Sequence, residues 1–362
     1  MADSPFPELK KTHTMARGGR PWRDHKPPPS APVWGIIQGF GSYWMLVAAI
    51  ELGVFDVIES GGPVAADPLA RQLDVSASHL AHLLDALVSF GFLDQVGGVY
   101  ELTETAERYL CTNGAASMAA LVAVAPGPLG NWTNLADTIR TGHVSTPIEN
   151  DPAAFYGPLV QATFPTQLRA AGRLGASLGW ARRPGLRVLD VGAGQAPWAI
   201  GILTQSPGST AVINDLPGVL QLAADTISDN DLEGRVELRE GDFHEIEFER
   251  ESYDIVVLGH VCRTEGEERA VSLVRRAYRA LAPGGQLLLT DYFADNERKF
   301  NPFGVQMGMT MLASTARGGM LTHAQVSGWL RDAGFEAIRL TEPIGFNQVY
   351  VASRPERDRS EP

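Results

Sequence analysis

The sequence predicts an α/β protein: a mostly parallel, doubly wound sheet with an antiparallel last strand, preceded by an N-terminal helical domain. Short β-rich runs alternate with helical segments after Gly185, and strands that alternate with helices form parallel sheets. These runs are 186–191, 210–214, 236–239, 255–258 and 286–290. Two later runs, 337–340 and 348–352, flank a short turn region and predict an antiparallel pair that closes the sheet.

Composition indicates a folded protein with two domains. The chain has 362 residues, of which 44% are hydrophobic and 20% are charged. A formal net charge of −12 argues against a nucleic-acid partner, because clustered Lys and Arg supply most of that affinity. The longest apolar stretches, such as 115–125, are judged too short to span a membrane, which predicts a cytoplasmic protein. Cys111 and Cys262 have no metal-type spacing, so no metal is expected.

Five segments are expected along the chain. These are a disordered arm (1–32), a winged-helix domain (33–125), a helical linker (126–182), the α/β domain (183–354) and a tail (355–362).

The winged-helix pattern rests on local signals in the N-terminal domain. One amphipathic helix is expected from Trp34 to the break at Gly61, followed by helices over 68–73 and 76–90, with Ser76 as the N-cap, and by a strand pair around Gly97 and Gly98. A DNA-reading role is the alternative. It is disfavoured because the helix over 76–90 carries His79, His82 and Asp85 where a DNA reader would carry Arg or Lys.

A glycine turn predicts a nucleotide-type site. The strand that contains Asp190 ends in Gly192-Ala193-Gly194, and Asp215 ends the next strand, 21 residues after Gly194, where an acidic side chain meets a ribose diol. NAD is the competing ligand, but Pro197 stands where its third glycine belongs. Asp190 also suits a cationic ligand without phosphate, such as S-adenosylmethionine. Further residues placed in this cofactor site are Leu216, Asp242, Phe243 and Gly259.

With these pieces in order, the sequence resembles the class I methyltransferases of the small-molecule O-methyltransferase family over about residues 34–352. The matching segments are 51–56, 84–87, 100–103, 188–194, 215–217, 241–243, 281–285 and 333–335. The resemblance implies a Rossmann-like sheet, a winged-helix dimerisation domain and a homodimer whose N-terminal domains interlock. It also implies that Gly192 and Gly194 line the cofactor, that Asp215 holds the ribose and that Asp242 and Phe243 frame the adenine.

The sequence departs from this family at the general base. The O-methylating members carry a His-Asp-Trp sequence at a fixed distance before the Pro-Gly-Gly turn, and at that position, counted back from Leu281, this chain has Arg263 followed by Thr264. In this family two carboxylate residues flank the general-base histidine. One of these positions corresponds to Asp291, and the other falls near Met320 or Leu321. Relatives that bind iron use the His-Asp pair as ligands, which Arg263 and Thr264 cannot replace.

The predicted catalytic residues are therefore His260, Arg263 and Asp291. His260 is either a displaced base or a hydrogen-bonded wall residue. Arg263 either binds an acceptor carboxylate or forms a salt bridge with Glu265, Glu267 or Glu268. The predicted substrate pocket comprises Trp132, Tyr156, Phe164, Phe303, Met307 and Met311.

The expected function is methylation of a small acceptor, with O-, C- and N-methylation left open. Loss of the base need not abolish transfer, because alignment alone supplies about 7–11 kcal/mol of the barrier. Two alternatives remain: a fold relative that uses S-adenosylmethionine without methylating, in a hydroxylation, decarboxylation or cyclisation, and a winged-helix regulator that senses the cofactor.

Overall fold

A computed structural model describes residues 30–124 and 129–357. The expected arm lies outside these residues except for 30–32, and so does the end of the expected tail. The chain divides into two units, residues 1–44 and 45–362, which are described separately. The domain boundaries expected at 33, 126 and 183 stay predictions.

The described part of the first unit is the beginning of helix α1 (Ala31–Glu51). Val33, Ile36, Ile37 and Phe40 recur at the spacing of one helix face and are all more than half exposed. The helix has 21 residues and a mean hydropathy of 1.4, so length and composition alone would allow it to span a membrane. The expectation that every apolar stretch is too short for a membrane was therefore wrong at α1.

The prediction of a single helix from Trp34 to Gly61 was also wrong, because the helix is interrupted at Gly53. Gly53 adopts a φ of 73°, a conformation that ends α1 and precedes α2 (Val54–Gly61). Helices α3 (Ala66–Leu73) and α4 (Ala77–Ser89) and strands β1 (Leu93–Val96) and β2 (Val99–Leu102) follow as predicted. A shared apolar core joins α2–α4 to the hairpin and to α5 (Glu104–Tyr109), which gives the expected winged-helix arrangement.

Ser76 precedes α4 at the predicted N-cap position, but its side chain does not cap the helix backbone. Its hydroxyl lies 2.9 Å from Nδ1 of His79 instead.

Short helices α6 (Ala119–Val124), α7 (Leu129–Thr133) and α8 (Leu135–Thr141) lead to the long helix α9 (Pro152–Leu178). The helix begins as local chemistry predicts, since the Asp151 carboxylate accepts a hydrogen bond from the amide of Ala154 and Pro152 stands in the first turn. It ends at Gly179, whose φ of 70° suits a helix C-terminus.

The C-terminal part contains a seven-stranded sheet with the order β10-β11-β7-β6-β3-β4-β5. Five strands are parallel, and β10 and β11 pair antiparallel, as predicted. The bounds are β3 (Arg187–Val191), β4 (Thr210–Asp215), β5 (Val236–Glu240), β6 (Tyr253–Gly259), β7 (Leu281–Asp291), β10 (Glu336–Leu340) and β11 (Gln348–Ser353). A separate short pair joins β8 (Phe293–Ala294) to β9 (Leu321–Thr322).

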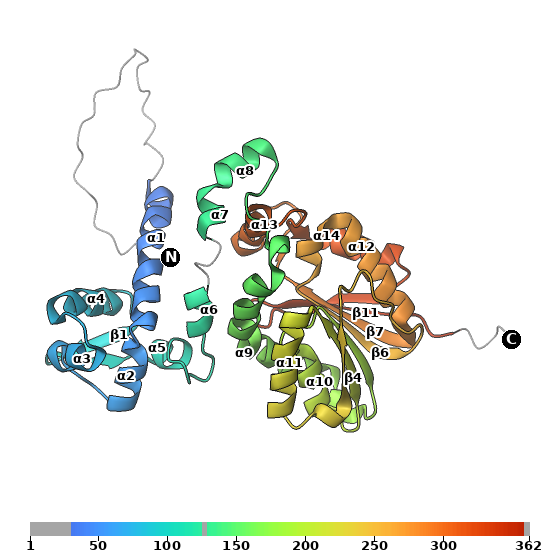
Figure 1. The fold of residues 1–362 in the computed structure, drawn as a ribbon, viewed down its shortest axis with the longest axis horizontal. Coiled ribbons are helices and arrows are strands. Elements are labelled where there is room, and N and C mark those ends of the chain that lie inside the picture. Colours follow the sequence, from blue (N-terminus) through green and yellow to red (C-terminus); the bar gives the residue numbers. More distant parts are fainter. Residues whose placement is uncertain (1–29, 125–128, 358–362) are drawn as a thin grey trace, which may run out of the picture. The chain divides into compact units, whose positions relative to one another are not determined.

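Helices cover both faces of this sheet (Figure 1). Alternate residues along β3 point to opposite cores: Val188 packs with α9, α10 (Pro197–Gln205) and α11 (Pro217–Asp229), whereas Leu189 packs with α12 (Cys262–Ala280) and α14 (His323–Asp332). Helix α13 (Pro302–Ser314) lies between β8 and β9 in the chain. Because both faces are covered, the ends of the parallel strands are where a ligand can reach the sheet.

The predicted turn at Pro283-Gly284-Gly285 lies inside β7. Tyr253 pairs with Leu281 and Ile255 pairs with Gln286, so the three residues bulge out of the ladder between these pairs. The strand therefore begins earlier than predicted.

Candidate active site

The carboxyl ends of the five parallel strands meet at one edge of the sheet, and the predicted cofactor residues follow them. Gly192 and Gly194 come directly after β3, and both have a φ of 61°. A Cβ atom on Gly192 would lie 2.5 Å from Cγ1 of Val261 and 3.4 Å from the ring of Phe243. Glycine is required here both by the backbone conformation and by the close approach of these two side chains.

Asp215 links the end of β4 to the glycine turn. Its Oδ2 accepts a hydrogen bond from the amide of Gly194 and its Oδ1 accepts one from the amide of Leu216, both at 2.7 Å. Burial raises the pKa of Asp215 to about 6 despite these two amides. The carboxylate is thus fixed in place with lone pairs left to accept further hydrogen bonds.

Asp190 lies within β3 and is almost fully buried. Its Oδ2 accepts a hydrogen bond from the amide of Ala199 in α10 at 3.0 Å, whereas Oδ1 has no hydrogen-bond partner among the described residues. Burial raises the pKa of Asp190 to about 8. A positive charge nearby would favour the ionised carboxylate.

The loop after β5 is held by helix α12. The Asp242 carboxylate accepts a hydrogen bond from the amide of His244, and the His244 ring bonds Glu265 at 2.8 Å. Arg269 pairs with Glu265 at 2.7 Å and lies 3.9 Å from Asp242, which closes a ring of charged side chains. His244 was not among the predicted site residues, although it stands directly after the predicted Asp242-Phe243 pair, and Glu265 was named only as a possible partner of Arg263.

Gly259 ends β6 beside Trp198, whose Cδ1 would be 3.2 Å from a Cβ at this position. His260 follows with a φ of 62° and is buried. Its Nε2 lies 2.9 Å from Oδ1 of Asn347, and its Nδ1 lies 3.8 Å from Oδ1 of Asp291.

The three predicted catalytic residues form one cluster. Nη1 of Arg263 donates to Oδ1 of Asp291 at 2.8 Å and to the carbonyl of His260 at 3.0 Å, and its guanidinium lies over the ring of Tyr292 at 5.1 Å. Burial alone would raise the pKa of Asp291, but the charge of Arg263 and the contact with His260 lower it to about 2. Asp291 is therefore an ionised partner of Arg263 at working pH.

A salt bridge from Arg263 to a nearby glutamate is not found. Glu265 pairs with His244 and Arg269, and Glu267 accepts a hydrogen bond from the indole of Trp329. The carboxylate that Arg263 does bind comes from the next strand of the sheet, which local sequence spacing does not reveal.

The predicted pocket residues only partly gather here. Phe303 on α13 packs against Tyr292 and Phe346, with ring centroids 5.1 and 4.8 Å away. Tyr156 lies near Arg263 and Thr264; burial raises its pKa to about 12, although both of these residues oppose the shift. Met307 is half-buried on α13, and Met311 is buried on the same helix.

The other two predicted pocket residues lie on different helices, α7 and α9. Trp132 is half-buried on α7, which runs beside α13. Phe164 packs against the core beneath α9 and α10.

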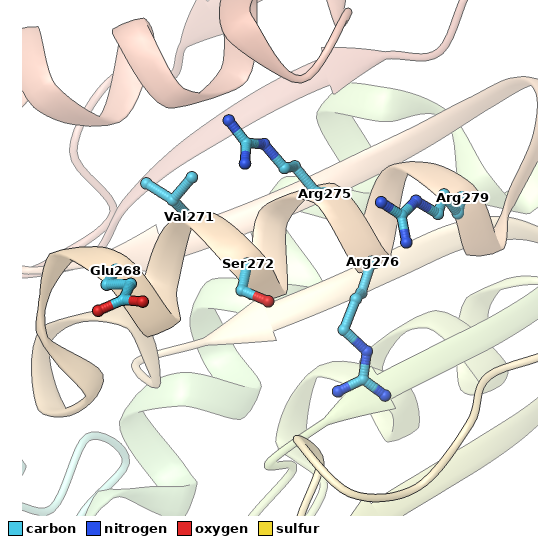
Figure 2. Close-up of a pocket in the computed structure, with 6 residues that line it drawn as sticks. All are labelled: Glu268, Val271, Ser272, Arg275, Arg276 and Arg279. Atoms are coloured by element: carbon cyan, nitrogen blue, oxygen red, sulfur yellow. The ribbon is translucent and has the colours of Figure 1, made fainter.

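Two other features lie apart from this edge. A surface recess follows the outer face of α12, lined by Glu268, Val271, Ser272, Arg275, Arg276 and Arg279 (Figure 2). In the winged-helix domain, ligand atoms of Asp56, Glu59 and Cys111 lie within 4.8 Å of one another. Asp56 already accepts two hydrogen bonds from Thr112, and burial raises the pKa of the Cys111 thiol to about 12, so this group is suited to structure rather than to metal binding.

Comparison with known proteins agrees with this architecture. The family model described as an O-methyltransferase dimerisation domain matches residues 34–112, and the one described as an O-methyltransferase domain matches residues 184–336. The chain is similar to the tetracenomycin polyketide synthesis 8-O-methyl transferase TcmO of Streptomyces glaucescens, at 25% identity over 86% of this chain and 92% of the relative. It is also similar to 3-hydroxy-5-methyl-1-naphthoate 3-O-methyltransferase of Streptomyces sahachiroi, at 27% identity over 84% of this chain and 89% of the relative.

Solved structures give the same fold. Human N-acetylserotonin methyltransferase in complex with SAM matches with a TM-score of 0.77 and 23% identity, over 92% of this chain and 99% of that chain. A mostly parallel seven-stranded sheet with a glycine turn after β3 defines a class I methyltransferase fold. The chain belongs to the small-molecule O-methyltransferase family of S-adenosylmethionine-dependent enzymes, which confirms the family resemblance.

Proposed function

We propose that the enzyme methylates a small aromatic acceptor and that both ligands bind at the carboxyl edge of β4, β3, β6 and β7. The observation that carries the proposal is the meeting of the glycine turn, Asp215 and the Arg263 cluster at this edge. When bound, S-adenosylmethionine supplies a methyl group on a positively charged sulfur. The relative from Streptomyces sahachiroi acts on a naphthoate, which supports an aromatic acceptor for this chain too.

The cofactor residues fit such a ligand. Asp215 can accept hydrogen bonds from two ribose hydroxyls, and Phe243 beside Gly192 offers an aromatic surface to an adenine. The unpartnered, buried Oδ1 of Asp190 suits a cationic ligand, because a positive charge favours the ionised form of that carboxyl. The same turn would not suit a diphosphate beside that carboxylate.

For the acceptor, we propose a site beside Tyr292, Phe303 and Phe346, with Met307, Met311 and Trp132 as further apolar contacts. Phe303 packs edge to face against Tyr292 and at a tilt of 32° against Phe346, and these rings offer aromatic surface to a planar ligand. Phe164 is not part of this proposal because it packs into the core.

We infer that no residue of the cluster acts as a general base. Arg263 stays protonated at working pH: burial acts to lower its pKa, but the charge and hydrogen bond of Asp291, together with Tyr292 and Tyr156, raise it on balance. Nε2 of His260 is bonded to Asn347, and Nδ1 is buried 3.8 Å from Oδ1 of Asp291 with no hydrogen-bond partner among the described residues. His260 is then a positioning residue, and alignment of the acceptor supplies most of the catalysis.

We further propose a cytoplasmic homodimer without a nucleic-acid or membrane partner. The dimerisation-domain match begins at residue 34, inside the exposed apolar stripe of α1, which supports burial of that stripe by a second copy. This use of α1 also accounts for its apolar character without a membrane.

The proposed function is tested by incubating the enzyme with S-adenosylmethionine and a panel of hydroxylated aromatic compounds, and by identifying products by mass spectrometry. A product heavier by one methyl group is expected, together with S-adenosylhomocysteine. An oxidised, decarboxylated or cyclised product without an added methyl group would contradict methyl transfer.

The role of His260 is tested with His260→Gln at saturating cofactor. A positioning residue should lower kcat by less than about ten-fold and leave the pH profile of kcat unchanged. A loss of about 100-fold or more with loss of the acidic limb would show instead that His260 is the base.

A further inference from the structure

The guanidinium of Arg263 uses only one of its edges within the protein. Nη1 makes both hydrogen bonds, to Asp291 and to the carbonyl of His260. Nε is buried and has no partner among the described residues, and Nη2 makes no hydrogen bond to any of them. The Nε–Nη2 edge therefore presents two parallel N–H donors, although the side chain is only 12% exposed.

An unpartnered buried donor is costly, by about 1–3 kcal/mol, and more so for a charged group. The glutamates Glu265 and Glu267, close to Arg263 in sequence, do not bond its free edge, because both have other partners. Asp291 is already bonded to Nη1 and to the amides of Arg263 and Tyr292. Among the described residues, no carboxylate forms a hydrogen bond or an ion pair with the free edge.

The surroundings of this edge favour an anion. Tyr156 is close enough to Arg263 for the guanidinium charge to act on its phenol, and with a pKa of about 12 that phenol remains a hydrogen-bond donor. Tyr292 covers one face of the guanidinium. The charge of Arg263 favours a negative ligand, and its two side-by-side N–H groups match the two oxygens of a carboxylate.

We propose that the acceptor carries a carboxylate and that the Nε–Nη2 edge of Arg263 binds both of its oxygens, with the aromatic ring of the acceptor beside Tyr292 and Phe303. This inference rests on the proposed function and narrows its acceptor to aromatic acids. In this chain a binding residue, Arg263, stands at the position of the family's histidine base. There it selects and orients the acceptor.

The test compares three ligands that differ at one group: 3-hydroxy-2-naphthoate, its carboxamide and 2-naphthol. Their binding is measured by calorimetry on the full-length enzyme with S-adenosylhomocysteine present. The acid should bind at least about ten-fold more tightly than either neutral compound, as expected of a bidentate charge-assisted pair.

Arg263→Lys should remove most of that preference, because an ammonium keeps the charge beside Asp291 but loses the fork. The double variant Arg263→Gln/Asp291→Asn removes both buried charges and should also bind the acid and its amide equally. Arg275→Gln is the matched control, since Arg275 is exposed on the same helix and has no ion pair or side-chain hydrogen bond within the described chain.

The outcomes separate the two proposals. Absence of S-adenosylhomocysteine binding to the wild type would contradict the proposed function. Normal S-adenosylhomocysteine binding with equal affinity for the acid and its amide, with no acid binding up to millimolar concentration, or with a preference that survives Arg263→Lys, would overturn the carboxylate inference alone.

Discussion

At the scale of single residues, we expect the ionisation of Asp215 to control cofactor affinity. Burial raises its pKa to about 6, so the carboxylate proposed to accept from the ribose is lost as the pH falls below 6. S-adenosylhomocysteine should bind about ten-fold more weakly at pH 5 than at pH 7.5, as measured by calorimetry. Asp190, with a pKa of about 8, is already protonated throughout the acidic part of that window.

Asp215→Asn should bind more weakly at pH 7.5 and lose this pH dependence, because an amide does not titrate there. Asp225→Asn, an exposed change on α11, should keep the wild-type curve. A wild-type affinity that stays constant between pH 5 and 7.5 would contradict the assignment of Asp215.

Gly192 is the second residue of the proposed cofactor site that we expect not to tolerate substitution. The Gly192→Ala variant would need a left-handed alanine backbone and would place a Cβ only 2.5 Å from Val261. We therefore expect its affinity for S-adenosylhomocysteine to fall by at least about ten-fold. Gly208→Ala is a matched control: Gly208 has a φ of 70° but no atom within 4 Å of its Cβ position. It should lose about 1 kcal/mol of stability and keep the affinity, and equal losses in both variants would point to backbone strain alone.

The sequence predicts where the proposed cofactor residues lie better than it predicts the contacts of the proposed catalytic ones. Gly192, Gly194 and Asp215 lie at strand ends, where a parallel sheet brings them together whatever the details of packing. The partner of Arg263 could not be predicted in this way, because the choice between Asp291 and three local glutamates depends on side-chain positions across two strands and a helix start.

At the scale of elements, α12 fixes the loop that follows β5. Arg276 donates to the carbonyls of Phe243 and Ile246 and lies over the ring of Phe248. Arg276→Met should therefore free the loop and weaken S-adenosylhomocysteine binding by several-fold, with a loss of stability of about 1–3 kcal/mol.

The neighbouring Arg275→Met is the control for this helix, because Arg275 is exposed and makes none of these contacts. Thermal unfolding and calorimetry would be run on both variants. Equal cofactor affinity in Arg276→Met and Arg275→Met would show that the loop is held by other contacts.

The elements themselves were mostly predictable, and the errors have physical causes. All the expected strands are present, and α9 lies within the expected helical linker; the apolar patterns of these segments made them predictable. The break at Gly53 was missed because apolar residues continue across it, and the bulge at Pro283 was read as a turn because Pro-Gly-Gly is typical of turns.

At the scale of the whole molecule, dimer formation should depend on α1. We expect light scattering to give twice the chain mass of 39.0 kDa for the wild type. The double variant Ile36→Lys/Phe40→Glu places charges in the exposed apolar stripe and should shift the enzyme toward the monomer on dilution. Ile139→Lys, at an exposed position on α8, should leave the mass unchanged, and a dimer that resists the α1 changes would exclude this stripe.

Because β11 lies between β7 and β10, the ribosome makes the strand that completes the sheet after all the others. Until it emerges, β7 is an open edge, β10 has no neighbour to pair with, and Asn347 is missing from the side of His260. A nascent chain thus carries the glycine turn and Asp215 on an unfinished sheet, and open edges invite pairing with other chains. Completion of the sheet therefore depends on the insertion of one late strand, and the risk of aggregation is concentrated in the interval before that strand is in place.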